Sequence, residues 1–182
     1  MRLLKYLLIS ILFISSVACQ AASKPLKVYI LAGQSNMEGK AKLGLLEHQI
    51  KTSPTDKRFA HFHKDGKFIE RDDVNIKFLK RKGKLTVGFG SPGCIGVELE
   101  FGHMMGDRFD EPVLLIKTAW GGKSIGRDFR PPSSGLPSDS KLNEILIKTN
   151  ANNKKKKRKE MNMTELKAQY GHYYRLMMTD IK

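Results

Sequence analysis

Ser35 is the residue of this sequence best placed to act as a nucleophile. It follows an apolar run, residues 28–32, and lies within Gly33-Gln34-Ser35-Asn36. A serine at a sharp turn between a strand and a helix holds its hydroxyl oxygen clear of the backbone, as acyl transfer requires. The alternative is that Ser35 and Asn36 only cap the next helix, which is common for these residue types after a strand. Spacing alone leaves both interpretations open.

A second turn of similar character follows the other clear strand. Residues 113–116 are apolar and lead into a turn that contains Gly121 and Gly122. This strand and residues 27–32 are continuous apolar runs, typical of central parallel strands covered on both faces. If the two strands are parallel neighbours, both turns lie at one end of the sheet, where ligands bind in α/β folds. Glycines there would let backbone N–H groups face a ligand.

Two helices are expected around these turns. The first covers residues 37–51, although Gly39 and Gly44 weaken it. The second follows a glycine-rich loop, residues 86–96, and carries His103, which we interpret as a core or boundary histidine rather than a catalytic one. Its predicted core-facing stripe, on one side of the helix, consists of Val97, Phe101, Met104, Met105 and Phe109.

The C-terminal segment is expected to form one further helix. Asn162 is a suitable N-cap, and Glu165 three residues later completes the pattern of a capping box. Gly171 lies within this segment and costs about 1 kcal/mol in a helix. The predicted apolar stripe consists of Leu166, Tyr170, Tyr173, Tyr174, Met177 and Ile181.

The rest of the chain gives weaker signals. Residues 52–84 are polar and uneven, and they predict short strands or a long excursion. His61 and His63 alternate there, but no third ligand lies nearby, so a metal site is disfavoured. Residues 127–135 are expected to form a rigid loop at the rim of the site. Two clear strands are at least two fewer than a doubly wound sheet needs, so we expect an incomplete sheet.

The net charge of +15 over 182 residues comes partly from one basic run, residues 154–159. The length suffices for one domain with a hydrophobic core. A basic run can bind nucleic acid or anionic lipid. This one follows a polar segment, residues 150–153, and contains no aromatic residues, which favours a solvated loop. No nucleic-acid-reading module is recognisable, so we expect no nucleic-acid partner.

Residues 1–22 have the organisation of an export signal: a basic start, a short apolar stretch and small residues. Cleavage after Ala18 would leave Cys19 first, as in bacterial lipoproteins. Cleavage after one of the next two alanines would release a soluble protein. Both routes predict export to the periplasm or the extracellular space, with membrane attachment only if Cys19 is lipidated. Cys94 then has no partner and is expected to be a buried free thiol.

Residues 29–37, Tyr-Ile-Leu-Ala-Gly-Gln-Ser-Asn-Met, resemble the signature of the sialate O-acetylesterase family. This is carbohydrate esterase family 6, within the SGNH hydrolase superfamily. Four further segments are similar to segments of the family in the same order, and the resemblance runs from residue 27 to 182. They are residues 96–102, 112–125, 128–134 and 170–177.

The resemblance implies an α/β fold over residues 27–182, a three-layer α/β/α, flavodoxin-like arrangement with a parallel sheet. It implies hydrolysis of acetyl esters on sugar hydroxyls, such as those of sialic acid or xylan, without a metal or cofactor. Ser35 matches the nucleophile. The N–H groups of Ser35 and of Gly121 or Gly122 match the oxyanion hole, with Gly122 favoured. Gln34 and Asn36 belong to the same predicted site, where Gln34 is expected to brace the turn.

The sequence also departs from the family pattern. A Gln-Gly block and an Asp-x-x-His pair are expected C-terminal to the last helix, and neither is present in these residues. A serine hydroxyl without a base is a weak nucleophile. We therefore expect a C-terminally truncated esterase that is weak or inactive. The alternative is a non-catalytic carbohydrate-binding remnant of the same fold, and a membrane-associated protein using its basic run ranks last.

Overall fold

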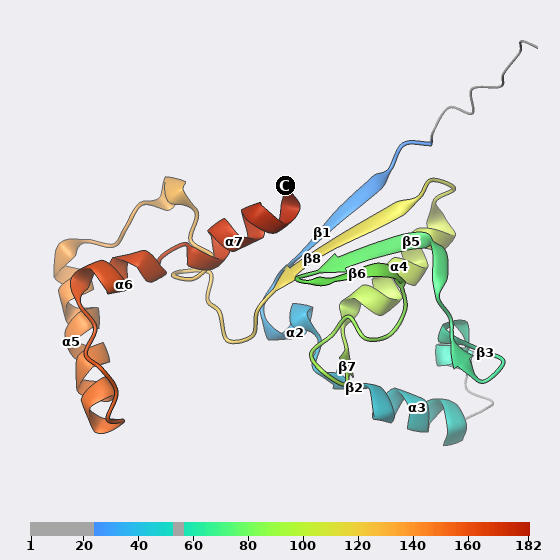
Figure 1. Cartoon of the computed structure of the whole chain (residues 1–182), viewed down its shortest axis with the longest axis horizontal. Coiled ribbons are helices and arrows are strands. Elements are labelled where there is room, and N and C mark those ends of the chain that lie inside the picture. The colour runs from blue at the N-terminus through green and yellow to red at the C-terminus, as the bar shows by residue number, and fades with distance from the viewer. Residues whose placement is uncertain (1–23, 53–56) are drawn as a thin grey trace, which may run out of the picture.

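The computed structural model describes residues 24–52 and 57–182, so the predicted export signal lies outside the described residues. Its main sheet has four strands in the order β1-β8-β5-β6 (Figure 1). β8 pairs in parallel with both β1 and β5, and β6 is antiparallel to β5. The fold is therefore mixed α/β with a parallel-containing sheet, as predicted. The four strands are β1 (Lys27–Gly33), β5 (Arg71–Phe78), β6 (Arg81–Leu85) and β8 (Val113–Ala119).

The two strands predicted from the sequence are neighbours, but β1 is not central. It forms one edge of the sheet, and Val28 and Ile30 are each 49% exposed. Tyr29 and Leu31 alternate with them and pack into the core, where the Tyr29 ring meets Phe101 edge-on. The prediction of a central strand covered on both faces is therefore wrong for β1. Among the four strands of this sheet, β8 alone is buried along most of its length. It is hydrogen bonded to a strand on each side.

Residues 52–84 contribute more to the sheet than their polar composition indicates. Within them, β5 is an interior strand, and Val74, Ile76 and Phe78 are almost completely buried. β6 returns as its hairpin partner, so short strands form in this segment, as predicted, and two of them belong to the main sheet. Two small strand pairs lie outside the main sheet. β2 (Ala41–Lys42) pairs with β7 (Cys94–Ile95). The short helix η1 (Lys57–Phe62) leads into the hairpin of β3 (His63–Lys64) and β4 (Lys67–Phe68).

Helix α4 (Val97–Arg108) covers one face of the sheet, but only partly through the predicted stripe, of which Phe101 and Met105 pack against the core. Val97 and Met104 are exposed, and the buried residues are Glu98, Leu99, Gly102, His103 and Gly106. The reason is close approach to the sheet. A Cβ on Gly102 would lie 2.1 Å from Leu85 Cδ2, so the helix approaches the strands most closely at this glycine, while Phe101 and Met105 are half-buried against the same core. His103 is a buried core residue, and Cys94 is a buried free thiol, both as predicted.

The first predicted helix is divided in two. α2 (Ser35–Glu38) ends at Gly39, and α3 (Leu43–Thr52) begins only after β2. Gly39 has φ = +89°, and a Cβ there would lie 2.7 Å from Gly96 Cα. The left-handed conformation and the close contact both require glycine, so the helix cannot continue through this position.

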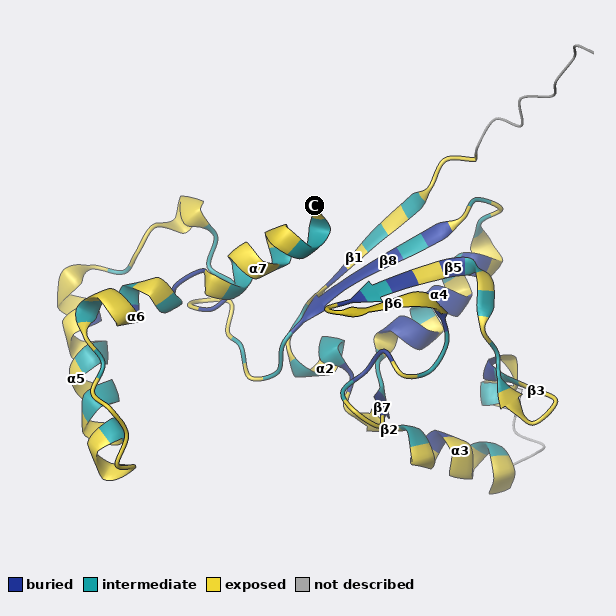
Figure 2. Ribbon diagram, viewed as in Figure 1, coloured by how far each residue is buried: buried dark blue, intermediate teal, exposed yellow. Residues whose placement is uncertain are grey.

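The C-terminal third contains η2 (Pro132–Ser134), α5 (Asp139–Lys155), α6 (Met163–Gln169) and α7 (His172–Ile181). Here α5 and α6 extend away from the sheet, whereas α7 lies against the end of the sheet, where Lys77 Nζ on β5 donates to Asp180 O at 2.6 Å (Figures 1 and 2). Leu142, Leu166 and Tyr170 form its small core. The predicted capping box of Asn162 is present. The single long helix is wrong, however, because Gly171 has φ = +70° and separates α6 from α7.

The apolar pattern does not predict α5, and it predicts a solvated loop for the basic run. Lys154 and Lys155 instead form the last turn of this helix, and the rest of the run follows it. All six basic residues are exposed. None of the helices in the described ranges has the length and apolar character needed to cross a membrane.

Candidate active site

Ser35 is the first residue of α2, directly after the carboxyl end of β1. The side chain of Gln34 accepts two hydrogen bonds from it at one oxygen. Gln34 Oε1 lies 3.1 Å from Ser35 Oγ and 3.2 Å from Ser35 N. Gln34 therefore is the N-cap and braces the turn, while Ser35 lies inside the helix rather than capping it. Asn36 is exposed in the same turn.

The second glycine turn lies beside this serine. Gly33 pairs with Ala119 across the two parallel strands, and the Trp120 N–H donates to Gly33 O at 3.2 Å. Gly121 and Gly122 follow at once. Gly122 has φ = +72°, with no heavy atom within 4 Å of a Cβ placed there. The two turns predicted from the sequence thus meet at one end of the sheet.

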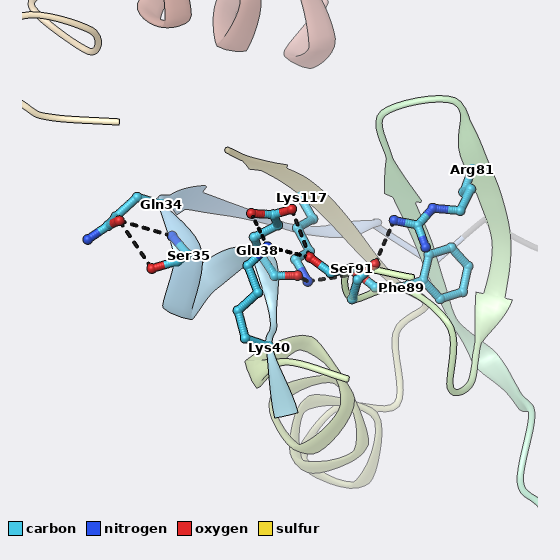
Figure 3. Close-up of polar contacts among 9 residues, drawn as sticks. Gln34, Ser35, Glu38, Lys40, Arg81, Phe89, Ser91 and Lys117 are labelled. Carbon is cyan, nitrogen blue, oxygen red and sulfur yellow. Dashed lines mark hydrogen bonds and ion pairs between the residues drawn. The ribbon is translucent and has the colours of Figure 1, made fainter. Parts of the chain in front are cut away.

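A buried ion pair lies beneath the two turns, and the sequence analysis missed it. Lys117 Nζ is 2.5 Å from Glu98 Oε2, and it also donates to Glu38 O at 2.9 Å and Phe89 O at 2.8 Å (Figure 3 shows the contacts to Glu38 and Phe89). Burial lowers the pKa of Lys117, although the Glu98 carboxylate opposes this shift. The sequence feature that could have predicted this ion pair is Lys117 itself, which lies in a largely apolar strand. A buried charge needs a partner, so such a lysine predicts an acidic residue nearby.

Glu38 connects α2 to the neighbouring segments. Its Oε1 accepts a hydrogen bond from Ser91 Oγ at 2.8 Å, and its Oε2 lies 3.0 Å from Lys40 Nζ (Figure 3). Burial raises the pKa of Glu38. The hydrogen bonds from Lys40 and Ser91, the charge of Lys40 and the Gly121 N–H outweigh this effect and hold that pKa below its ordinary value.

A shallow hollow of about 250 Å³ adjoins the Ser35 turn. Gln34 forms part of its wall, and Lys123 contributes the positive charge. Lys123 Nζ lies 4.4 Å from the centroid of the Tyr173 ring. The hollow is therefore a mixed apolar and cationic surface beside the candidate nucleophile. Its lining residues are Ala32, Gly33, Gln34, Lys123, Ile125 and Phe129.

The predicted rim loop is held by Asp128, which is buried. Burial raises the pKa of Asp128, but the Ser124 N–H, 2.9 Å away, and the charge of Arg127 keep it below its ordinary value. The Asp128 carbonyl also accepts a hydrogen bond from the Tyr173 N–H at 2.9 Å. This loop therefore joins the hollow to α7. Within this loop, Phe129 is the residue that lines the hollow.

None of the five histidines is hydrogen bonded to Ser35 in the part of the chain that the structure describes. His61 bonds to Glu100 at 2.7 Å, His103 is buried in α4, and His172 packs its ring against Tyr173. The described residues also contain no group of three or more His, Cys, Asp or Glu arranged to hold a metal ion. Within the described residues, the hydrogen-bond partner of Ser35 Oγ is therefore Gln34.

Comparisons with known proteins give one family. A sequence model described as "Carbohydrate esterase, sialic acid-specific acetylesterase" matches residues 25–167. No curated protein matches the chain. A solved structure of a protein from Arabidopsis thaliana is similar at 11% sequence identity and a TM-score of 0.34. That match covers 85% of this chain and 68% of the Arabidopsis chain.

Proposed function

Since the chain belongs to the sialic acid-specific acetylesterase family of carbohydrate esterases, we propose that it acts on acetyl esters of sugar hydroxyls through Ser35. One observation supports this assignment above the others. The parallel register of β1 and β8 brings Ser35 next to Gly121 and Gly122, in a chain whose family hydrolyses such esters. The three-layer SGNH arrangement is part of the same proposal.

The proposed chemistry uses few groups. Ser35 Oγ attacks the acetyl carbonyl, the bond from that carbon to the sugar oxygen breaks, and the sugar leaves as a free hydroxyl with the serine proton. Water then hydrolyses the acetyl-serine and releases acetate. In both steps the N–H groups of Ser35 and Gly122 stabilise the negative charge that develops on the carbonyl oxygen. One fixed donor of this kind can contribute about 3 kcal/mol to the transition state. Both Ser35 groups are bonded to Gln34 Oε1 in the free chain. Substrate must therefore displace this exposed side chain before reaction.

The absence of a histidine at Ser35 in the described residues limits the expected rate. Without a base, catalysis depends on the oxyanion donors and on substrate binding. In other serine hydrolases these two contributions give only a residual rate acceleration once a triad member is removed. We therefore propose very slow hydrolysis for these 182 residues. The same observation favours a second candidate, a carbohydrate-binding protein that retains the cleft without turnover.

The test is acetate release from O-acetylated sialic acid and from acetylated xylan by the purified chain. Ser35→Ala is compared with wild type, and Ser133→Ala, at an exposed serine in η2, serves as the matched control. We expect rates near background, with a small component that only Ser35→Ala removes. Sugar binding with no such component supports the second candidate. Fast turnover that is abolished by Ser35→Ala would contradict the inference that Ser35 lacks a general base.

Export is a further part of the proposal. The basis is the organisation of residues 1–22, with lipidation at Cys19 as the alternative to release. Expression in a bacterial host followed by fractionation and mass determination of the mature chain tests it. A mature protein that begins after residue 18 and carries lipid would select the anchored form.

A further inference from the structure

We propose that a second hollow, between the rim loop (residues 127–135) and the junction of α6 with α7, binds an oxyanion: a carboxylate or a phosphate group. Its volume is about 270 Å³. Three of its lining side chains are basic, those of Arg130, Lys167 and Arg175, and none of the described residues that line it is acidic. We call it the cationic hollow. It contains no residue of the proposed ester chemistry, so this inference goes beyond the proposed function and does not depend on it.

The two arginines of the cationic hollow have no carboxylate partner within the described ranges. Their hydrogen bonds go to backbone carbonyls. Arg71 shows the contrast, because its guanidinium binds the carboxylates of Asp73 at 2.7 Å and Asp107 at 2.5 Å. A carbonyl is neutral, so the charges of Arg130 and Arg175 are held in place without being neutralised.

Arg130 closes the rim loop upon itself. Its Nε donates to Gly135 O at 2.7 Å, its Nη2 to Ser134 O at 2.9 Å and its Nη1 to Gly126 O at 3.3 Å. These bonds use every nitrogen of the guanidinium and fix its plane. The side chain is therefore positioned before any ligand arrives, which reduces the entropy cost of binding.

Arg175 approaches from α7 and is fixed in the same manner. Its Nη1 donates to Tyr170 O at 3.0 Å and its Nη2 to Ala168 O at 3.1 Å, at the end of α6. A Cβ built on Gly171 would lie 2.6 Å from Arg130 O and 3.3 Å from Arg175 Nη1. The two arginine-bearing segments thus meet closely at this glycine, and both contribute to one wall.

The donor chemistry selects an oxyanion as the ligand. A guanidinium has five N–H donors, and within the described residues two remain in Arg130 and three in Arg175. Its planar fork matches the oxygens of carboxylate and phosphate. Lys167 adds a third cation. The ion pair of Lys167 with Asp139, at 3.2 Å, is exposed, so solvent screens it and much of the positive charge stays available.

Two sources could supply such a group: an acidic sugar residue of a glycan, or free phosphate. The rim loop borders both hollows, because Phe129 lines the hollow beside Ser35 and the next residue, Arg130, lines the cationic hollow. This continuity favours an acidic sugar residue, whose ring could extend along the loop. The experiment separates the two sources.

The test is an NMR titration of the purified chain at constant ionic strength. The probes are glucuronate, glucose as the uncharged sugar, and inorganic phosphate. The readout is the set of backbone amide signals of residues 130–136 and 167–175. Shifts with either anion and not with glucose support the site. Shifts with glucuronate identify an acidic sugar as a ligand, and shifts with phosphate alone identify the free anion. Added sodium chloride should weaken binding, because salt screens the attraction.

Two variants test the assignment to these arginines. Arg175→Gln should raise the Kd of the bound anion at least about tenfold, since a charge-assisted partner is lost. Because this change also removes bonds to the end of α6, Leu136→Glu provides the second test. It keeps both arginines and adds a competing carboxylate at an exposed position of the wall, with the same expected effect. Ile147→Glu, at an exposed position of α5 outside the hollow, is the matched control and should leave Kd within about twofold.

Three results would overturn the inference. The first is the absence of shifts with both anions, and the second is a response to glucose equal to the response to glucuronate. The third is a Leu136→Glu variant that binds as tightly as Ile147→Glu. Ser35→Ala should bind the anion like wild type, so failure of the esterase proposal would leave this result unchanged.

Discussion

Lys117 on β8 and Glu98 at the start of α4 form an ion pair that is closed to solvent, with side chains 0% and 1% exposed. All three Lys117 donors and both Glu98 oxygens have hydrogen-bond partners. Lys117 donates to two backbone carbonyls, and Glu98 Oε1 accepts the Gly96 N–H at 2.9 Å. The pair therefore joins the helix, the sheet and the end of α2 at one point beneath the candidate site.

Lys117→Met should lower the free energy of unfolding by about 3–5 kcal/mol, because it leaves the Glu98 carboxylate buried without a cation. The double variant Lys117→Met with Glu98→Leu should recover much of this loss, since no unpaired charge remains. Urea unfolding followed by circular dichroism measures both.

The matched control for this prediction is Lys148→Met, which removes one partner of the exposed Lys148–Glu144 pair. Solvent screens that pair, so its loss should be far smaller. Equal destabilisation by Lys117→Met and Lys148→Met would show that the buried pair contributes no more to the free energy of unfolding than the exposed pair.

Gly102→Ala should destabilise the protein by about 1–3 kcal/mol through overpacking, because the new Cβ would meet the Leu85 side chain at 2.1 Å. Gly44→Ala is the control. It also lies in a helix but has open space around it, and it should be neutral or stabilising by up to about 1 kcal/mol. The difference in unfolding midpoint between the two variants is the measurement, and a Gly102→Ala variant as stable as Gly44→Ala would contradict the packing.

These glycines also explain which parts of the fold the sequence could not predict. The apolar periodicity of α4 predicts that Met104 faces the core, yet Met104 is exposed and the helix buries Gly102 and Gly106. The close approach of the helix to the sheet, rather than side-chain hydrophobicity alone, decides which of these residues are buried. In the same way, Gly39 and Gly171 end helices through positive φ values that the apolar pattern does not encode. Periodicity reports which residues are apolar, and backbone conformation decides where an element stops.

The site was easier to predict than the helices. Two continuous apolar runs, each ending at a glycine turn, were enough to predict that Ser35 and Gly121 lie together, because parallel neighbours bring their carboxyl ends to one edge. The network below them could not be obtained this way. Glu38, Ser91 and Lys117 lie far apart in the sequence and meet only through the packing of the turns.

His103 should make stability depend on pH below neutrality. Its pKa is lowered from the ordinary value of 6.5, first by burial and then by the charges of Arg71 and His61, against the opposing effects of Asp107 and Glu100. As the pH falls below 6.5, the unfolded chain therefore gains a proton at this position before the folded chain does. The free energy of unfolding should fall with pH from about 6.5 down to the lowered pKa of the folded state.

His103→Gln should remove this part of the pH dependence, whereas His48→Gln, at an exposed position of α3, should keep it. Urea unfolding at a series of pH values between 7 and about 5 provides the measurement. Asp73 and Asp128 have lowered pKa values, so their contributions are lost only at lower pH, below the ordinary aspartate value of 3.8. An unchanged pH slope in His103→Gln would mean that another group titrates in this range.

Gly122→Ala tests the backbone of the proposed oxyanion turn. At φ = +72° a Cβ costs about 1–2 kcal/mol even though the surrounding space is open, so the turn must carry strain or change conformation. We expect a loss of that size in the free energy of unfolding or, if the peptide reorients, a loss of about tenfold in Ser35-dependent acetyl ester hydrolysis, since one oxyanion donor would be displaced. Gly126→Ala, in the loop that follows and without a positive φ, should change neither. If both variants behave like wild type in unfolding and in rate, the left-handed conformation of Gly122 has no role in the turn.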